Sequence, residues 1–251
     1  MSHPGDEETL DDLLHGRLRI YQKTQGFRYS IDALLLADFA GKAIKGRKPG
    51  SIKVLDLGSG TGVIPLALSL CPEIGHIVGL EIAGPMVEMS RRSVTPNSLD
   101  EKISIIEGDI RKPPAELQDQ QFDLIVANPP YRRKGEGRLN PDHHKAIARH
   151  EITVNLQDIV KTASRLIKPR GVACFIYGAY RMTDLLSGLR GAGIEPVRMR
   201  FIHSRLAEPA KMLLIEAHQD GPAEVKIDPP LLVYRDENNY TEEVELIFQG
   251  P

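Results

Sequence analysis

The chain of 251 residues is long enough to bury a substantial core, and its formal net charge of −2 neither predicts nor excludes a nucleic-acid partner. No apolar run approaches the roughly 20 residues of a membrane span, and residues 1–12 are too acidic and polar for a signal peptide, so we expect a cytoplasmic protein. Cys71 and Cys174 lie far apart, beside or inside apolar runs, which predicts buried free thiols rather than metal ligands.

Short apolar runs rich in β-branched residues alternate with longer segments of helical periodicity, the pattern of βαβ units. The expected helices are residues 31–40, 63–70, 84–94, 156–167 and 180–191, and we expect the Ser30 hydroxyl to cap the first. The expected strands are residues 52–57, 77–80, 103–107, 122–127, 172–177, 197–202 and 212–216. This order predicts an α/β fold, Rossmann-like, with a mostly parallel seven-stranded sheet and helices on both faces.

We expect a single domain over residues 1–251, with a lead-in at 1–40 and a C-terminal tail at 219–251. The tail contains Asp-Gly-Pro and Asp-Pro-Pro, which are turn and breaker signals, and it therefore reads as an appended segment.

A glycine-rich loop ends the first clear strand and opens a helix, in the sequence V-L-D-L-G-S-G-T-G. Its candidate ligand-binding residues are Asp56, Gly58, Ser59, Gly60, Thr61 and Gly62. The alternative is a purely structural role, as a tight strand-to-helix turn. The loop is neither the dinucleotide fingerprint, since the third glycine comes one residue early, nor a P-loop, since no Gly-Lys-Ser/Thr follows. A carboxylate two residues before the first glycine suits a positively charged ligand, and S-adenosylmethionine is such a ligand.

Two further acidic residues follow the next two strands. Glu81, with Ile82 after it, stands at the carboxyl end of one strand, where a carboxylate can accept hydrogen bonds from both ribose hydroxyls. Asp109 could accept a hydrogen bond from an adenine amino group, with Ile110 against the ring, although Gly-Asp is also common turn chemistry.

The sequence N-P-P-Y, residues 128–131, directly follows the strand at 122–127. If the Asn128 side-chain oxygen and the Pro129 carbonyl each accept one N–H, a conjugated amino nitrogen becomes tetrahedral and its lone pair can reach a methyl group. Pro129 and Pro130 make the segment rigid, and Tyr131 offers a face for a planar substrate to stack on. We therefore expect these four residues to be catalytic, with Asn128 also at the cofactor; a rigid proline turn is the structural alternative.

In order and spacing, these motifs resemble those of the class I S-adenosylmethionine-dependent methyltransferases. N-P-P-Y is similar to the motif of the amino-methyltransferases, which act on adenine N6, cytosine N4, guanine N2 or glutamine amides. Residues 14–40 and 229–244 resemble the bacterial tRNA adenine N6-methyltransferases that modify adenine 37 of a valine tRNA. The resemblance implies S-adenosylmethionine as donor and an unpaired tRNA adenine as substrate.

The segment after N-P-P-Y is basic, and Arg132, Arg133, Lys134 and Arg138 are its candidate RNA contacts. A solvated basic loop is the alternative. Three histidines in the same segment lack a convincing fourth ligand, so we expect no metal. Protein glutamine methylation, and a non-catalytic scaffold that binds S-adenosylmethionine, remain open as other functions.

Overall fold

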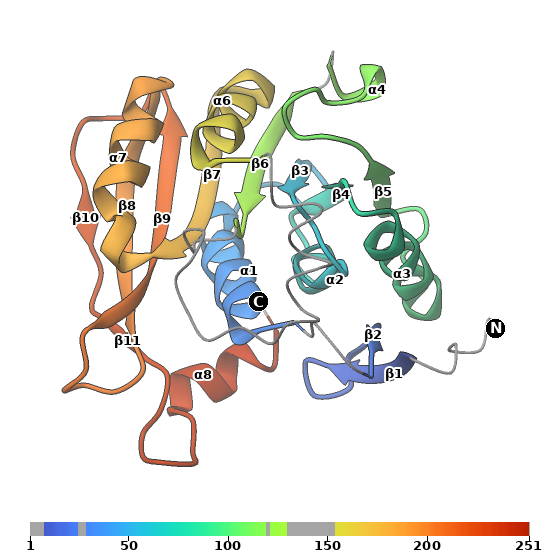
Figure 1. Ribbon diagram of the computed structural model, residues 1–251, viewed down its shortest axis with the longest axis horizontal. Helices are drawn as coiled ribbons and strands as arrows, with labels where there is room; N and C mark the ends of the chain where they lie inside the picture. Colours follow the sequence, from blue (N-terminus) through green and yellow to red (C-terminus); the bar gives the residue numbers. More distant parts are fainter. Residues whose placement is uncertain (1–7, 25–28, 119–120, 130–153, 251) are drawn as a thin grey trace.

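A central twisted sheet organises the computed structural model, which describes residues 8–24, 29–118, 121–129 and 154–250 (Figure 1). Across the sheet, the strand order is β5-β4-β3-β6-β7-β9-β8, and two short strands, β10 and β11, pair with the outer side of β8. The bounds are β3 Ile52–Leu57, β4 Ile74–Glu81, β5 Ile103–Glu107, β6 Phe122–Ala127, β7 Ile167–Gly178, β8 Ile194–His203, β9 Ala210–Gln219, β10 Lys226–Ile227 and β11 Leu231–Leu232. Among the described strands of this sheet, only β9 runs antiparallel to its neighbours, so the mostly parallel sheet is confirmed. The two short strands bring the sheet to nine strands rather than the expected seven.

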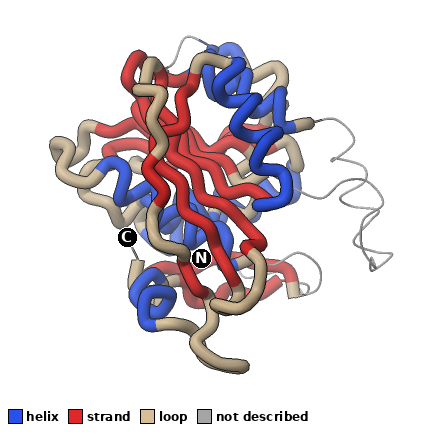
Figure 2. The backbone as a smooth tube through the Cα atoms, turned by 90° about the vertical axis from the view of Figure 1, so that its left-hand side faces the viewer, coloured by secondary structure: helices blue, strands red, loops and turns tan. Residues whose placement is uncertain are grey.

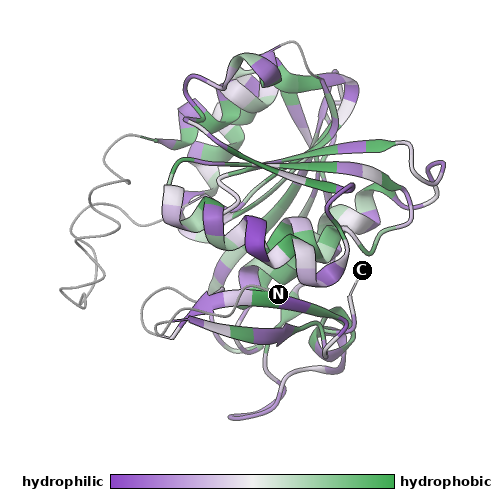
Figure 3. Ribbon diagram, turned by 90° about the vertical axis from the view of Figure 1, so that its right-hand side faces the viewer, coloured by the Kyte–Doolittle hydropathy of each residue, from purple (hydrophilic) through white to green (hydrophobic). Residues whose placement is uncertain are grey.

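Helices cover both faces of the sheet (Figure 2). One face carries α1 Ile31–Ile44, α2 Val63–Leu68 and α3 Gly84–Val94; the other carries α4 Ala115–Gln118, α6 Leu156–Leu166 and α7 Met182–Gly191. Successive strand residues point to opposite faces, so Val54 belongs to the first core and Leu55 to the second. Figure 3 shows the hydrophobic segments concentrated in the strands between the two helical layers.

A hairpin that the sequence did not reveal lies outside the first helical layer. It consists of β1 Glu8–Leu13 and β2 Leu18–Lys23. The Tyr21 N–H donates to Ser93 Oγ on α3 at 3.0 Å, and Arg92 of α3 forms an ion pair with Glu8 at 2.6 Å. These contacts fix the hairpin against the helix that follows β4.

The C-terminal tail is integrated with the sheet rather than merely appended. Arg198 on β8 pairs with Asp228 at 3.2 Å, and Arg200 on the same strand pairs with Glu243. Glu243 lies in α8, Glu242–Ile247, whose first turn is capped by Thr241. The tail therefore closes the β8 edge and returns to pack α8 against α1.

Several element ends differ from the sequence predictions. Helix 180–191 begins two residues late, after a 3-10 turn at Ala179–Arg181, and the strands at 197–202 and 212–216 are longer than expected because they form one extended antiparallel pair. Ser30 is the N-cap residue of α1, but its side chain makes no capping hydrogen bond; its carbonyl accepts the Ala33 N–H instead. Both cysteines are buried and free, as expected.

Candidate active site

The sequence motifs meet at one edge of the sheet because the strands that precede them are parallel. Asp56 on β3 lies opposite Gly79 on β4 and Val126 on β6. The loops that follow β3, β4, β5 and β6 therefore leave the sheet side by side at its carboxyl edge, which is where ligands bind in open α/β sheets.

The glycine-rich loop adopts the backbone conformation that its glycines permit. Gly58, Gly60 and Gly62 have φ values of 80°, 55° and 84°, in the left-handed region where a Cβ costs energy. The Gly58 and Ser59 N–H groups donate to the Leu80 carbonyl at 2.8 and 3.1 Å, which ties the loop to the end of β4. The prediction that this segment connects a strand to a helix is confirmed, since α2 begins at Val63.

Two close contacts between glycines and serine side chains around this loop were not predicted from the sequence. A Cβ on Gly62 would stand 2.2 Å from Ser90 Oγ on α3, and a Cβ on Gly79 would stand 2.8 Å from Ser59 Oγ. A glycine inside a strand is a signal of close backbone approach, so Gly79 could have been found. Ser90 could not, because nothing in the sequence distinguishes it from other helical serines.

Glu81 organises the loop through its carboxylate. One oxygen accepts the Gly60 N–H at 2.9 Å, and the other accepts the Ile82 and Ala83 N–H groups, both at 2.9 Å. The carboxylate is partly exposed, and each oxygen has two lone pairs, so the oxygen that accepts only the Gly60 N–H can still accept one hydrogen bond from a ligand. Its position at the strand end is the one the sequence predicted.

Asp56 is a buried carboxylate beneath the loop. It is fully buried, and within the described part of the chain neither of its oxygens has a hydrogen-bond partner. Burial raises the pKa of this carboxyl well above its ordinary value of 3.8, and the negative charge of Glu81 raises it further. The buried hydroxyls of Ser59 and Ser90 also lack partners among the described residues. Unsatisfied polar groups of this kind are uncommon in folded proteins and call for an explanation such as a ligand.

Asp109 and Ile110 follow β5 and close one side of this region. Arg111 binds both Asp109 oxygens, at 2.5–3.0 Å, and these hydrogen bonds hold the pKa of Asp109 below its ordinary value. Ile110 is buried, and its Cδ1 is 3.8 Å from the position of a Cβ on Gly58. Ile110 therefore lies directly against the glycine loop, whereas Asp109 has an arginine partner that the sequence analysis did not foresee.

Asn128 and Pro129 directly follow β6, the neighbour of β3. Asn128 is half-buried and Pro129 is buried. Asn128 stands two residues beyond Val126 and Gly58 stands two residues beyond Asp56, so the start of N-P-P-Y is level with the start of the glycine loop. Pro130, Tyr131, Arg132, Arg133, Lys134 and Arg138 lie outside the described residues.

The site fits a cationic, hydrogen-bonding ligand such as S-adenosylmethionine. Its features are a loop that excludes side chains, a buried carboxylate without a partner and a second carboxylate at the loop's edge. A positive ligand would relieve the burial penalty of a charged Asp56. Among the described residues there is no group of three or more potential metal-ligating side chains. No helix within the described ranges is long and apolar enough to cross a membrane.

Comparison with known proteins defines the class. Residues 49–195 match the family model described as a methyltransferase domain, which is more than half of the chain. A solved structure described as a predicted O-methyltransferase from Agrobacterium tumefaciens superimposes with a TM-score of 0.67 at 21% identity, covering 87% of this chain and 97% of that one. The fold is thus the Rossmann-like class I methyltransferase fold.

Two curated relatives narrow this class. A tRNA1(Val) (adenine(37)-N6)-methyltransferase from Porphyromonas gingivalis is 32% identical over 76% of this chain and 72% of the relative. One of the same name from Vibrio cholerae is 28% identical over 89% of this chain and 87% of the relative. The chain belongs to the methyltransferase family that these relatives represent. It is an enzyme, and its methyl donor is S-adenosylmethionine.

Proposed function

We propose that this enzyme methylates the exocyclic N6 of an unpaired adenine in tRNA, with adenine 37 of a valine tRNA as the leading candidate. The observation that carries the proposal is the placement of Asn128 and Pro129 at the end of β6, level with the glycine loop on β3. The activity for which the relatives are named supports adenine over the glutamine amide, and the intact motif argues against a non-catalytic scaffold.

The cofactor-binding residues in this proposal are Asp56, Gly58, Ser59, Gly60, Thr61, Gly62, Glu81, Ile82, Asp109, Ile110 and Asn128. Glu81 keeps the Gly60 amide in place and offers the remaining lone pair of that oxygen to a ribose hydroxyl. Asp56 supplies buried negative charge beneath a cationic ligand. The bound cofactor contributes an electrophilic methyl group on a sulfonium.

The chain's own contribution to the reaction is to hold the adenine amino group. The Asn128 side-chain oxygen and the Pro129 carbonyl each accept one N–H, which localises the nitrogen lone pair and stabilises the positive charge that develops there. Pro129 lacks an N–H and so cannot compete as a donor at this point. By sequence, we assign base stacking to Tyr131 after the rigid Pro130.

An adenine in a tRNA loop suits this site because it is already unpaired, so moving it into the pocket costs less than opening a duplex. By sequence, Arg132, Arg133, Lys134 and Arg138 are proposed to contact the flanking phosphates. A tRNA substrate also implies that the enzyme works in the cytoplasm.

The test is transfer of label from methyl-labelled S-adenosylmethionine. Purified enzyme is offered unmodified total tRNA, ribosomal RNA, DNA and a release factor in parallel, and each labelled product is hydrolysed and analysed. We expect N6-methyladenosine from tRNA alone. Label on protein glutamine, or cofactor binding without any transfer, would refute the proposal.

A further inference from the structure

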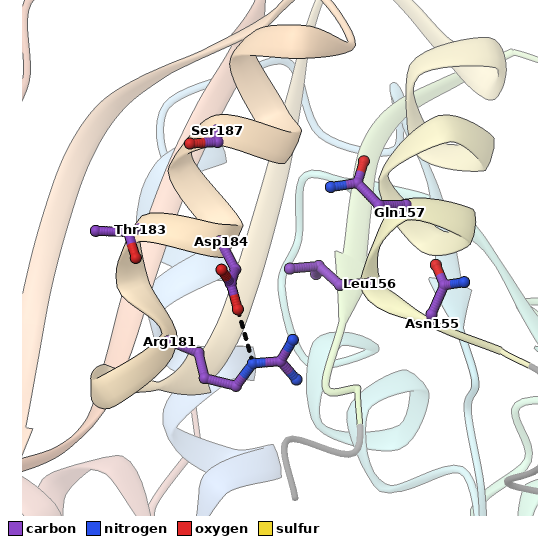
Figure 4. A pocket seen from close by; sticks show the side chains of 7 residues that line it. All are labelled: Asn155, Leu156, Gln157, Arg181, Thr183, Asp184 and Ser187. Atoms are coloured by element: carbon purple, nitrogen blue, oxygen red, sulfur yellow. Dashed lines mark hydrogen bonds and ion pairs between the residues drawn. The ribbon is translucent and has the colours of Figure 1, made fainter. Parts of the chain in front are cut away.

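A cavity lies at the carboxyl edge of the sheet, between the first turns of α6 and α7 (Figure 4). Its volume is about 420 Å³. Its polar lining consists of Asn155, Gln157, Arg181, Thr183, Asp184 and Ser187. A cavity of this size is in the range of small-ligand pockets.

The cavity lies across β6 from the cofactor loops. Helix α6 contacts β6, whose end carries Asn128, and α7 follows β7, the next strand of the sheet. The glycine loop, Glu81 and Asp109 follow β3, β4 and β5 on the other side. The cavity is thus on the side of β6 away from the cofactor loops, where part of a substrate held at Asn128 has space to bind.

The charges of the lining groups are balanced. Arg181 forms an ion pair with Asp184, with Nε 3.0 Å from the carboxylate oxygen, and the other polar groups are two amides and two hydroxyls. Figure 4 shows the Arg181 guanidinium reaching from the turn before α7 into the space between α6 and α7. A neutral set of donors and acceptors is suited to the edge of a nucleobase rather than to a phosphate.

Flat and apolar surfaces accompany these polar groups. Leu156 lines the same cavity and is buried, and the guanidinium of Arg181 gives the lining a planar group. Unpaired RNA bases are bound in proteins by stacking on aromatic rings or guanidinium planes, combined with hydrogen bonds to their edges. The cavity offers both kinds of contact.

We propose that this cavity binds an unpaired nucleobase next to the methylated adenine and so selects the sequence of the substrate RNA. The inference rests on the proposed function and deepens it. Gln157 and Arg181 are the residues that read the base edge: amide and guanidinium groups make paired hydrogen bonds to purines, and each such pair gives roughly 5- to 100-fold discrimination.

The test uses stem-loop RNAs that carry one unpaired target adenine and each of the four bases at the positions on either side of it. Methyl transfer and RNA binding by fluorescence anisotropy are measured for wild type, Gln157→Ala and Arg181→Ala. We expect wild type to prefer one base at one flanking position by at least tenfold, in line with the discrimination of one paired contact. Each variant should reduce that preference to about twofold, with KM for S-adenosylmethionine unchanged.

Arg190→Ala is the matched control. Arg190 lies on the same helix and also pairs with a carboxylate, Glu195, but it sits in the last turn, at the opposite end from the cavity. Its removal should leave the base preference intact. Gln157 is exposed, so its variant should fold normally even if Arg181→Ala does not.

Three results would overturn the inference. If wild type methylates the RNAs but Gln157→Ala keeps the full preference, the cavity does not read a base while the proposed function stands. If a variant binds all the RNA sequences equally more weakly, and its slope of log Kd against log salt concentration is smaller by about one, the substituted residue contacts a phosphate rather than a base. If wild type methylates no RNA, the proposed function fails and this inference fails with it.

Discussion

The two halves of the carboxyl edge are built in different ways. The half that we propose for the cofactor, called the cofactor half, is formed by the loops after β3, β4 and β5 and depends on left-handed glycines, an amide fixed by Glu81 and a buried carboxylate. The half that we propose for the substrate, called the substrate half, is formed by the end of β6 and the starts of α6 and α7 and depends on polar side chains at or near the surface. The comparison teaches that the first half is constrained by backbone conformation and by close approaches at Gly62 and Gly79, whereas the second can change specificity without disturbing the fold.

The largest effect is expected where the two halves meet. Asn128→Ala removes one of the two proposed acceptors for the amino group, and loss of one preorganised hydrogen-bonding group at a reacting centre typically costs about 100- to 1000-fold in kcat. Cofactor affinity, measured by calorimetry, should stay within about fivefold, since one neutral hydrogen bond is worth roughly 1 kcal/mol. A large loss of cofactor affinity with unchanged kcat would reverse the assigned roles.

Within the cofactor half, two glycine substitutions distinguish the cost of backbone strain from the cost of a steric clash. Gly62→Ala adds a Cβ 2.2 Å from Ser90 Oγ at a φ of 84°, and we expect a loss of about 2–5 kcal/mol in unfolding free energy from overpacking and backbone strain together. Gly60→Ala has a positive φ but nothing within 4 Å, so about 1–2 kcal/mol is expected.

Chemical denaturation of both variants measures this difference. Adding Ser90→Gly to Gly62→Ala should recover part of the loss, because it removes the hydroxyl that the new Cβ meets. Equal losses for Gly62→Ala and Gly60→Ala would show that the close approach to Ser90 has no energetic weight.

Glu81→Ala should mainly raise the cofactor's dissociation constant. The carboxylate accepts three backbone N–H groups, one of them in the glycine loop, and one hydrogen bond to a charged group contributes roughly 1.5–3 kcal/mol net, so loss of one such contact with the cofactor should weaken binding about 10- to 100-fold. Turnover at saturating cofactor should fall far less. Glu88→Ala, an exposed glutamate on α3, is the control and should change neither quantity.

A smaller effect concerns pH and Asp56. Its pKa is raised in the folded protein by burial and then by Glu81, so folding without ligand favours the protonated carboxyl. Below about pH 3.8 the Asp56 carboxyl is protonated in both the folded and the unfolded state, so its full contribution to the free energy of unfolding is present. As the pH rises from there to the folded pKa, the unfolded state releases the proton first, and this contribution is lost progressively.

Asp56→Asn removes this titration. Without cofactor, the variant should gain stability relative to wild type as pH rises from 4 toward neutrality, which urea denaturation at several pH values will measure. The same variant should bind S-adenosylmethionine more weakly. A stability difference that does not change with pH would contradict a raised pKa for Asp56.

The conformation of the glycine loop and the positions of the strand-end acids were predictable because their signals are local. Glycines at residues 58, 60 and 62 and the acidic residues at strand ends identify their own conformations and positions. The partners of these groups were not predictable, since Ser90 and Arg111 look like ordinary helix and loop residues until the fold brings them close.

The outer parts of the fold were harder to predict for a different reason. The hairpin at residues 8–23 is short, and its acidic first strand resembles a solvated lead-in. The cavity between α6 and α7 combines Gln157 with Arg181, which are 24 positions apart on two helix starts. Each alone is typical of a solvent-facing helical turn, so only the packing of the two helices reveals the pair.

The tail that runs along β8 has a consequence for solubility. The open side of an outer strand presents unpaired amides and carbonyls that can recruit another chain. Here β10 and β11 each occupy a stretch of that side, and the ion pairs of Arg198 and Arg200 hold the tail in place. The residues after Gln219 therefore protect the β8 edge from edge-to-edge aggregation. Their removal should reduce the solubility of the enzyme before it affects methyl transfer.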